Sequence, residues 1–174
     1  MLFSNGHTHR RRRGPLARTF AHKLIAEKRK DVAERCDRLI GGLKGRGEVS
    51  FLDEIAGPLP AEVIGAMLGV PEADMPQFAQ HVYSAIRGLS IVSQDIRDES
   101  DADLAQLNGL VAKLIEQRRG LADGELVSSY LERTSGGDLD EAEILAQMVG
   151  LVQAGSDTTR GALTATVSWL LQNP

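Results

Sequence analysis

Cysteine is nearly absent from this chain, whose 174 residues include one, Cys36. A single thiol excludes an internal disulfide framework and any metal site built from several cysteines. Chains without disulfides are typical of a reducing compartment, so the sequence predicts a cytoplasmic protein. The stretch AERCDRLIGG around Cys36 has the pattern of an amphipathic helix, in which we expect a buried or half-buried thiol.

Long apolar runs are also missing. The chain opens MLFSNGHTHRRRRG, which lacks the apolar stretch and the small-residue cleavage site of a secretory signal. A membrane-spanning helix needs about 18 or more consecutive apolar residues, and Gln153, Asp157 and Arg160 interrupt the best candidate. These patterns predict a soluble protein that has no membrane as a partner.

Positive charge is concentrated in the first part of the sequence. Residues 1–50 carry 13 Lys and Arg against 5 Asp and Glu, a net charge of +8, whereas residues 51–174 carry 7 against 19, a net charge of −12. A basic head of this kind can meet nucleic acid, an acidic protein or an anionic cofactor. The acidic remainder and the lack of a recognisable helix-turn-helix pair argue against nucleic acid. One open interpretation is a non-enzymatic helical module whose basic head binds an acidic partner or nucleic acid.

Apolar residues recur with helical periodicity along the chain, and no segment has a convincing strand pattern. The sequence therefore predicts an all-α fold in one domain, residues 1–174, without a second domain. We expect one or two amphipathic helices over residues 10–40, stopped by GGLKGRGE. The further helices are expected over residues 60–68, over residues 72–87, from a cap at Ser100 to about residue 120, within DGELVSSYLERTSGG, and from Asp140 onwards.

The last of these predicted helices is the longest. Asp140 and Glu143 have the spacing of a capping box, with Asp in place of the usual Ser or Thr, and acidic residues crowd the first turn, where the helix dipole favours them. About 30 residues would give roughly 45 Å of helix at 1.5 Å per residue. Apolar residues surround much of the circumference, which predicts a helix buried on several sides.

The stretch QAGSDTTRG, residues 153–161, lies in the middle of this helix although it is rich in poor helix formers. The Thr158 hydroxyl can donate to the Ala154 carbonyl, which loosens or bends a helix, and Gly155 lets a flat ligand or another backbone approach closely. A hydroxyl and the Asp157 carboxylate at one level suit proton delivery to a group on the small-residue face. The spacing alone slightly favours a simpler interpretation, a kink or a close helix crossing with Asp157 paired to a surface arginine.

Four stretches, in the right order, resemble the cytochrome P450 family. AGSDTT at 154–159 is similar to the family's central-helix signature, Ala/Gly-Gly-x-Asp/Glu-Thr-Thr, and its flanks GDLDEAEILAQMVGLVQ and LLQNP match bacterial members. HTHRRRRGPLARTF resembles the third helix, PLPAEVIGAMLGVPEADMPQF the helix that enters the substrate lid, and LVSSYL…GGDLDEAEIL the approach to the central helix. The resemblance covers nearly the whole chain. It implies part of a soluble haem-thiolate monooxygenase, with a long buried central helix among amphipathic helices.

The resemblance implies a haem cofactor that lies against the central helix. Ala154 and Gly155 resemble the small pair that lies over the haem. Thr158 resembles the threonine that hydrogen-bonds dioxygen on the iron, and Asp157 resembles the acid that replenishes the protons. The second threonine, Thr159, is expected to be structural.

The third-helix stretch contains the family's His-x-x-x-Arg in two registers. Counting back from ARTF selects His9 and Arg13 over the pair that begins two residues earlier. By the resemblance, both side chains donate hydrogen bonds to the haem propionates, and the arginine fork matches a carboxylate. We expect Arg10 and Arg12 on a solvated basic face.

The resemblance also implies two partners. An acidic electron-transfer protein of the ferredoxin type would meet the basic head, where Arg10, Arg12 and Lys23 are candidate contacts. The substrate class is a small apolar organic molecule. The apolar residues of the lid region allow such a substrate but are equally ordinary core residues: Phe78, Val82, Tyr83, Ile86, Leu89 and Ile91.

One part of the family's site has no match in these 174 residues. In the family the iron-ligating cysteine lies in a glycine-rich loop beyond the central helix, and Cys36 does not lie in such a loop. We therefore expect this chain alone to bind haem weakly or without thiolate ligation, and to have no monooxygenase activity.

Overall fold

The computed structural model describes these residues: 5–20, 26, 28–90, 92–137 and 139–173. Two residues named above, Lys23 and Ile91, lie outside them. Helices make up all the regular structure in the described part of the chain, and no strand occurs there. The predicted all-α fold is therefore confirmed.

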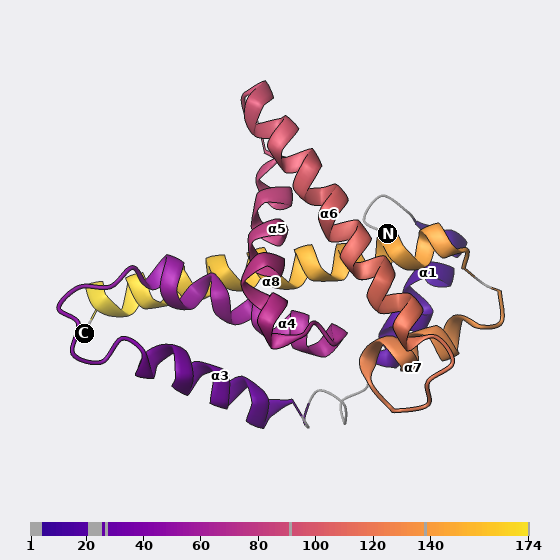
Figure 1. Ribbon diagram of the computed structural model, residues 1–174, viewed down its shortest axis with the longest axis horizontal. Helices are drawn as coiled ribbons and strands as arrows, with labels where there is room; N and C mark the ends of the chain where they lie inside the picture. The colour runs from indigo at the N-terminus through magenta and orange to yellow at the C-terminus, as the bar shows by residue number, and fades with distance from the viewer. Residues whose placement is uncertain (1–4, 21–25, 27, 91, 138, 174) are drawn as a thin grey trace.

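The described helices and helical turns have a simple order along the chain. The elements are α1 (Gly6–Thr19), α3 (Arg29–Gly41), the π-helical turn η1 (Leu52–Ala56), α4 (Pro58–Leu68), the 3₁₀ turn η2 (Glu72–Asp74), α5 (Met75–Arg87), α6 (Gln94–Arg118), α7 (Leu126–Thr134) and α8 (Glu141–Gln172). Figure 1 shows α8 as the long axis of the molecule, crossed by the hairpin of α5 and α6. The helices α1 and α7 gather at the first turns of α8.

The core lies where α4, α5, α6 and α7 meet the first half of α8. Its fully buried side chains come from all five helices: Leu68, Phe78, Val82, Leu107, Val111, Leu126, Tyr130, Met148 and Val152. Small residues let these helices approach closely. At Gly65 of α4, an added Cβ would lie 2.6 Å from the sulfur of Met75 and 3.1 Å from the ring of Phe78. Bulk at this position is therefore excluded by packing against α5.

We expect Gly65→Ala to destabilise the fold by up to about 2 kcal/mol. Overpacking a core costs about 1–3 kcal/mol, and a gain of roughly 1 kcal/mol in helix propensity offsets part of this cost. Gly109→Ala in α6 is the matched control, because Gly109 is helical and exposed and a Cβ there meets nothing within 4 Å. Urea unfolding should show Gly109→Ala more stable than the wild-type chain. Equal stabilisation by both substitutions would contradict the close packing at Gly65.

The N-terminus of α8 has the capping box that the sequence predicts. The Asp140 carboxylate accepts from the Glu143 N–H at 2.7 Å, and the Glu143 carboxylate accepts from the Asp140 N–H at 3.3 Å. The helix continues for 32 residues, close to the expected length. The local signals of residue type and spacing were sufficient here because every contact is made within one turn.

The start of α6 differs from the prediction. The helix begins at Gln94, and Ser100 lies buried inside it, where its hydroxyl donates to the Ile96 carbonyl at 2.7 Å. Ser100 also packs against Gly88, where an added Cβ would lie 2.5 Å from the Ser100 Cβ. The cap predicted at Ser100 is therefore wrong.

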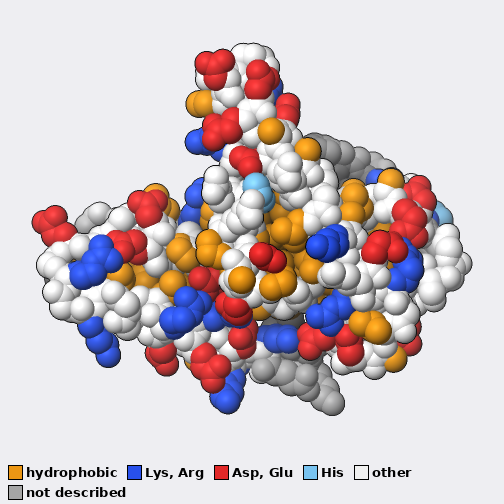
Figure 2. Space-filling view, viewed as in Figure 1, with side chains coloured by type: hydrophobic (Ala, Val, Ile, Leu, Met, Phe, Trp, Pro, Cys, Tyr) orange, Lys and Arg blue, Asp and Glu red, His pale blue; other side chains and the backbone are white. Residues whose placement is uncertain are grey.

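The polar stretch before Ser100 resembles a loop in composition but is helical for electrostatic reasons. Acidic side chains at a helix N-terminus interact favourably with the helix dipole. Figure 2 shows acidic side chains gathered at the tip of the α5–α6 hairpin. The Gln94 amide donates to Asp98 at 2.6 Å, and Arg87 pairs with Glu99 at 2.6 Å. These pairs are side-chain contacts that apolar periodicity does not reveal.

The second half of α8 also differs from the prediction. Its first half is buried as expected, at Ile144, Met148 and Val152, whereas Trp169 and Leu170 are 62% and 53% exposed. Apolar residues all round a helix predict packing neighbours on every side. In the described part of the chain, the last turns of α8 have neighbours on only some sides. None of the described helices, α8 included, is both long enough and apolar enough to cross a membrane.

Candidate functional site

The middle of α8 presents an exposed strip of small residues. Ala154 and Thr158 are one turn apart and both are exposed. Residues 4, 7, 8 and 11 positions apart on a helix share a face, so the strip continues in both directions through other exposed small residues: Gly150, Gly161, Ala162 and Ala165. An added Cβ at Gly150 or Gly161 would meet nothing within 4 Å. The strip is therefore a shallow surface several turns long, against which a flat molecule can lie.

The back-bond predicted for Thr158 is confirmed. Its hydroxyl donates to the Ala154 carbonyl at 2.6 Å, and Thr159 and Ser156 make the same bond to Gly155 and Val152, at 2.8 Å each. The chain nevertheless stays α-helical throughout 153–161, so the locally opened helix that the sequence suggested is not found. A carbonyl has two lone pairs and can accept from the hydroxyl while it keeps its helical partner.

Gly155 points away from the strip. An added Cβ there would lie 3.4 Å from the Cδ1 atom of Ile64 in α4, which is ordinary van der Waals contact. Successive residues are turned by about 100° around a helix, so Ala154 and Gly155 face different neighbours. Ala154 faces the open strip, and Gly155 faces α4.

Asp157 lies beside the strip in an ion pair within its own helix. Its Oδ1 is 2.6 Å from Nη2 of Arg160, three residues on. The Arg160 guanidinium in turn lies over the ring of Tyr83 in α5, with its carbon 4.4 Å from the ring centroid. The pairing of Asp157 with an arginine, which the simpler interpretation of the motif proposed, is therefore present. It occurs next to an open face, on a stretch of α8 whose other sides contact α4 and α5.

A hollow of about 510 Å³ opens between α5, α6 and α8, next to Asp157. Most of its lining is polar, and it includes the following residues: Gln80, Ser84, Arg87, Ser90, Glu99, Asp103, Asp157 and Arg160. The apolar residues of the lid region, which the sequence left open as substrate contacts or ordinary core residues, lie mainly elsewhere. Phe78 and Val82 are fully buried in the core, and Leu89 is 76% exposed. Tyr83 and Ile86 line this hollow.

Ion pairs join the basic helix α1 to the first turn of α8. Arg11 grips both carboxylate oxygens of Glu143, at 2.7 and 2.6 Å, and Arg12 Nε donates to the same carboxylate at 2.9 Å. The solvated position predicted for Arg12 is therefore wrong, whereas Arg10 is exposed as expected. Glu143 is 11 residues before Ala154 and on the same face of α8, so α1 lies at the N-terminal end of the strip, about 16 Å away along the helix axis.

His9 and Arg13 remain available on α1. They are one turn apart, with His9 half-buried and Arg13 exposed. Within the part of the chain that the structure describes, neither side chain makes a hydrogen bond or an ion pair. Arg11 is engaged with Glu143, which agrees with the register that selects Arg13 as the arginine open to a ligand.

The fork on Glu143 predicts a specific loss of stability in acid. Hydrogen bonds from Arg11, then from Arg12 and the Asp140 N–H, lower the pKa of Glu143 from 4.5 to about 2. A carboxylate with a depressed pKa stabilises the fold above its unfolded value and loses this effect as the pH falls through the folded value. The destabilisation caused by Glu143→Gln should therefore be full above pH 4.5 and should shrink between pH 4.5 and 2. Urea unfolding of both chains across this range measures it, and a difference independent of pH would contradict the ion pair.

The residues present fit a flat anionic macrocycle. The strip is exposed and free of large side chains around Ala154, and the cationic helix α1 lies at one end of it. The fit of the macrocycle does not depend on an iron ligand from this chain. Cys36 lies half-buried on α3, which packs against α4 and η1. No group of three or more His, Cys, Asp or Glu among the described residues could hold a metal ion.

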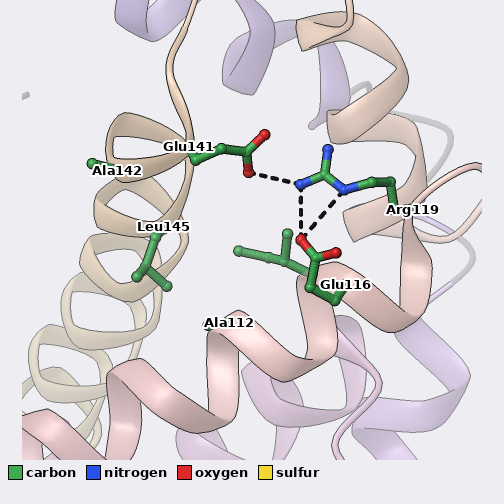
Figure 3. A pocket seen from close by; sticks show the side chains of 7 residues that line it. Ala112, Glu116, Arg119, Glu141, Ala142 and Leu145 are labelled. Carbon is green, nitrogen blue, oxygen red and sulfur yellow. Dashed lines mark hydrogen bonds and ion pairs between the residues drawn. The ribbon is translucent and has the colours of Figure 1, made fainter.

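A second hollow, of about 490 Å³, lies between the end of α6 and the start of α8 (Figure 3). Arg119 spans it and bonds to Glu116 at 3.0 Å and to Glu141 at 2.7 Å. The guanidinium thus bridges both carboxylates, and the three groups together keep one negative charge. It shares no residue with the strip, and we assign it no part in the site.

The comparisons with known proteins point in one direction. No family model matches the chain. The chain is 33% identical over 176 aligned positions to the plant-inducible cytochrome P450-pinF1 of Rhizobium radiobacter and 30% identical to the vitamin D(3) 25-hydroxylase of Pseudonocardia autotrophica, and both alignments include all of this chain. Its fold superposes on the mixed-function P450 MycG with a TM-score of 0.87 and 26% identity, over 99% of this chain and 44% of that one. The chain belongs to the cytochrome P450 family.

The chain spans 42% of the length of these two curated P450 relatives. The family accounts for the order of the helices and for the P450 signature in α8. It also implies haem as the cofactor. The sequence had signals for Asp157 and Thr158 and placed Tyr83 among the apolar lid residues, but nothing in it indicated the contact of Tyr83 with Arg160, which joins two helices. For the ion pair of Asp157 with Arg160, the sequence signal is their spacing of three residues on a helix.

Proposed function

We propose that this chain supplies the haem-facing and proton-delivering part of a cytochrome P450 monooxygenase. The reaction proposed is the oxidation of a small apolar organic substrate with dioxygen and two electrons. The observation that carries the proposal is the exposed small-residue strip of α8, which has Thr158 on it and Asp157 beside it. The names of the relatives, which include a hydroxylase, support it.

Each predicted site residue has a distinct part in this proposal. Haem, when bound, supplies the chemistry of dioxygen reduction. Ala154 leaves room for the macrocycle on the strip, and Gly155 next to it leaves room for Ile64 of α4 behind the strip. His9 and Arg13 hold the carboxylates of the macrocycle from α1. The His9 and Arg13 side chains have no hydrogen-bond or ion-pair partner in the described part of the chain. They can therefore donate the hydrogen bonds that a buried carboxylate requires.

Thr158 and Asp157 handle protons. The Thr158 hydroxyl donates to the Ala154 carbonyl at 2.6 Å, so its lone pairs are free to accept a hydrogen bond on the open side of the helix. Rotation of the hydroxyl then lets it donate to a group on the strip. The Asp157 carboxylate is partly exposed beside the polar hollow and can exchange protons with solvent. General acid–base groups of this kind contribute roughly 10²–10⁴-fold to a rate.

The proposal also covers the redox partner, the extent of the domain within this chain and the cellular compartment. We propose a ferredoxin-type electron donor that meets the basic head, to which Arg10 contributes an exposed charge. Residues 1–174 form a single part of the P450 domain. The single cysteine favours the cytoplasm as the compartment. A nucleic-acid partner has no support, since two of the four consecutive arginines are engaged with Glu143.

The 174 residues by themselves should not form a thiolate-ligated haem protein. Their one cysteine lies on α3, away from the strip. We expect haem added to the purified chain to bind weakly, without the thiolate-type Soret band in the reduced carbon monoxide difference spectrum and without monooxygenase activity. Cys36→Ala is the control, and its spectrum should match that of the wild-type chain. A thiolate-type band that disappears in Cys36→Ala would show that this expectation is wrong.

A further inference from the structure

Arg160 connects the acid of the proposed site to a different helix. One end of its guanidinium pairs with Asp157 at 2.6 Å, and its face lies 4.4 Å from the ring centroid of Tyr83. A guanidinium within about 6 Å of an aromatic centroid is attracted by the ring quadrupole. The carboxylate on α8 is therefore in contact, through one side chain, with α5.

The Tyr83 side chain is anchored by a hydrogen bond to the backbone. Its hydroxyl donates to the Gly57 carbonyl, between η1 and α4, at 2.6 Å. Burial raises the pKa of Tyr83 to about 12, so the phenol stays protonated and continues to donate this bond. A backbone carbonyl thus anchors the ring independently of Arg160.

The other charges around the hollow are engaged elsewhere. Arg87 pairs with Glu99 at 2.6 Å, and His81 bonds to Asp103 at 2.5 Å. In the part of the chain that the structure describes, Arg160 is the one cation paired with Asp157. The direction of the Asp157 carboxylate consequently depends on where the Arg160 guanidinium is held.

We propose that Arg160 is a positioning residue for Asp157, and that the Tyr83 ring, anchored on the Gly57 carbonyl, fixes Arg160. This inference rests on the proposed role of Asp157 in proton delivery. An exposed ion pair three residues apart holds its side chains only weakly, whereas a planar guanidinium stacked on a ring loses less freedom for each bond it forms. Contact between α8 and α5 therefore sets the orientation of the proton-delivering acid, and a displacement of α5 changes it.

The 174-residue chain allows a direct test by NMR. Stacking on Tyr83 should shift the Arg160 side-chain protons upfield by the ring current. Tyr83→Leu should abolish this shift and should also change the ¹³C signal of the Asp157 carboxyl, which Asp157→Asn assigns. Tyr83→Phe keeps the ring but loses the bond to the Gly57 carbonyl, so both of its signals should lie between those of the wild-type and Tyr83→Leu chains. An Asp157 carboxyl signal identical in the wild-type and Tyr83→Leu chains would overturn the proposal.

A second test uses the haem-containing P450 that carries this sequence. Arg160→Gln and Tyr83→Leu should each lower the product formed per electron about two- to fivefold, the factor that corresponds to an exposed cation–π contact. Arg160→Lys should be intermediate. In an Asp157→Asn background, Tyr83→Leu should have no further effect, whereas a merely structural role would leave its effect intact.

The outcomes separate the two proposals. If Asp157→Asn leaves product formation unchanged, the proposed function of Asp157 is wrong. If Asp157→Asn lowers product formation but Arg160→Gln and Tyr83→Leu do not, the positioning role alone is wrong.

Discussion

Replacing Thr158 by alanine should lower product formation by about 10²-fold or more in the haem-containing P450 that carries this sequence. Positioned proton transfer contributes roughly 10²–10⁴-fold to a rate, and Thr158 is the hydroxyl on the exposed strip. Asp157→Asn should have an effect of similar size, because the amide keeps the shape of the carboxylate but cannot supply protons in the same way. Electrons that are still consumed should appear as peroxide. Cofactor oxidation, product and peroxide are measured together.

Two control variants distinguish proton handling from structure. Thr159→Ala removes a hydroxyl with the same kind of back-bond, to Gly155 at 2.8 Å, and should keep most of the activity. Thr158→Ser keeps a hydroxyl at the site and should also remain active. Equal losses in Thr158→Ala and Thr159→Ala would instead indicate that both hydroxyls act on the helix, and the role of Thr158 would have to be abandoned.

A large side chain on the strip should prevent haem binding while the fold stays intact. We expect Ala154→Trp to lower the haem content of the P450 by at least about tenfold, since loss of 1.4 kcal/mol of binding free energy is sufficient for a tenfold effect. An indole at this position would occupy the surface against which the macrocycle lies. Because Ala154 is exposed, the stability of the 174-residue chain itself should change by no more than about 0.5 kcal/mol. Haem absorbance and urea unfolding measure the two effects.

Ala105→Trp is the matched control for this experiment. Ala105 is an exposed alanine in the middle of a different helix, α6. The control variant should keep its haem. If both variants lose haem, or if Ala154→Trp binds it normally, the strip of α8 is not the haem-facing surface.

The local features of α8 could be predicted from the sequence because their contacts are local. Asp140 and Glu143 form a capping box within one turn, and Thr158 reaches the Ala154 carbonyl one turn away. Helix geometry fixes such distances wherever the helix lies in the molecule. The same reasoning failed at Ser100, since the polar first turns of α6 are stabilised by side-chain pairs and by packing under Gly88, neither of which apolar periodicity reveals.

The sequence by itself determined the helical fold class, the long central helix and the presence of a hydroxyl beside a carboxylate in its middle. Tertiary structure decided which faces are open and which charges are paired. Arg11 and Arg12 meet Glu143 more than 130 residues further along the chain, and Arg160 meets Tyr83 of another helix. Tertiary packing also decides which residues are buried: Gly155 faces Ile64, while Ala154 and Trp169 are exposed. A residue's own type and spacing set what it can bond, but its neighbours in space depend on how distant helices pack.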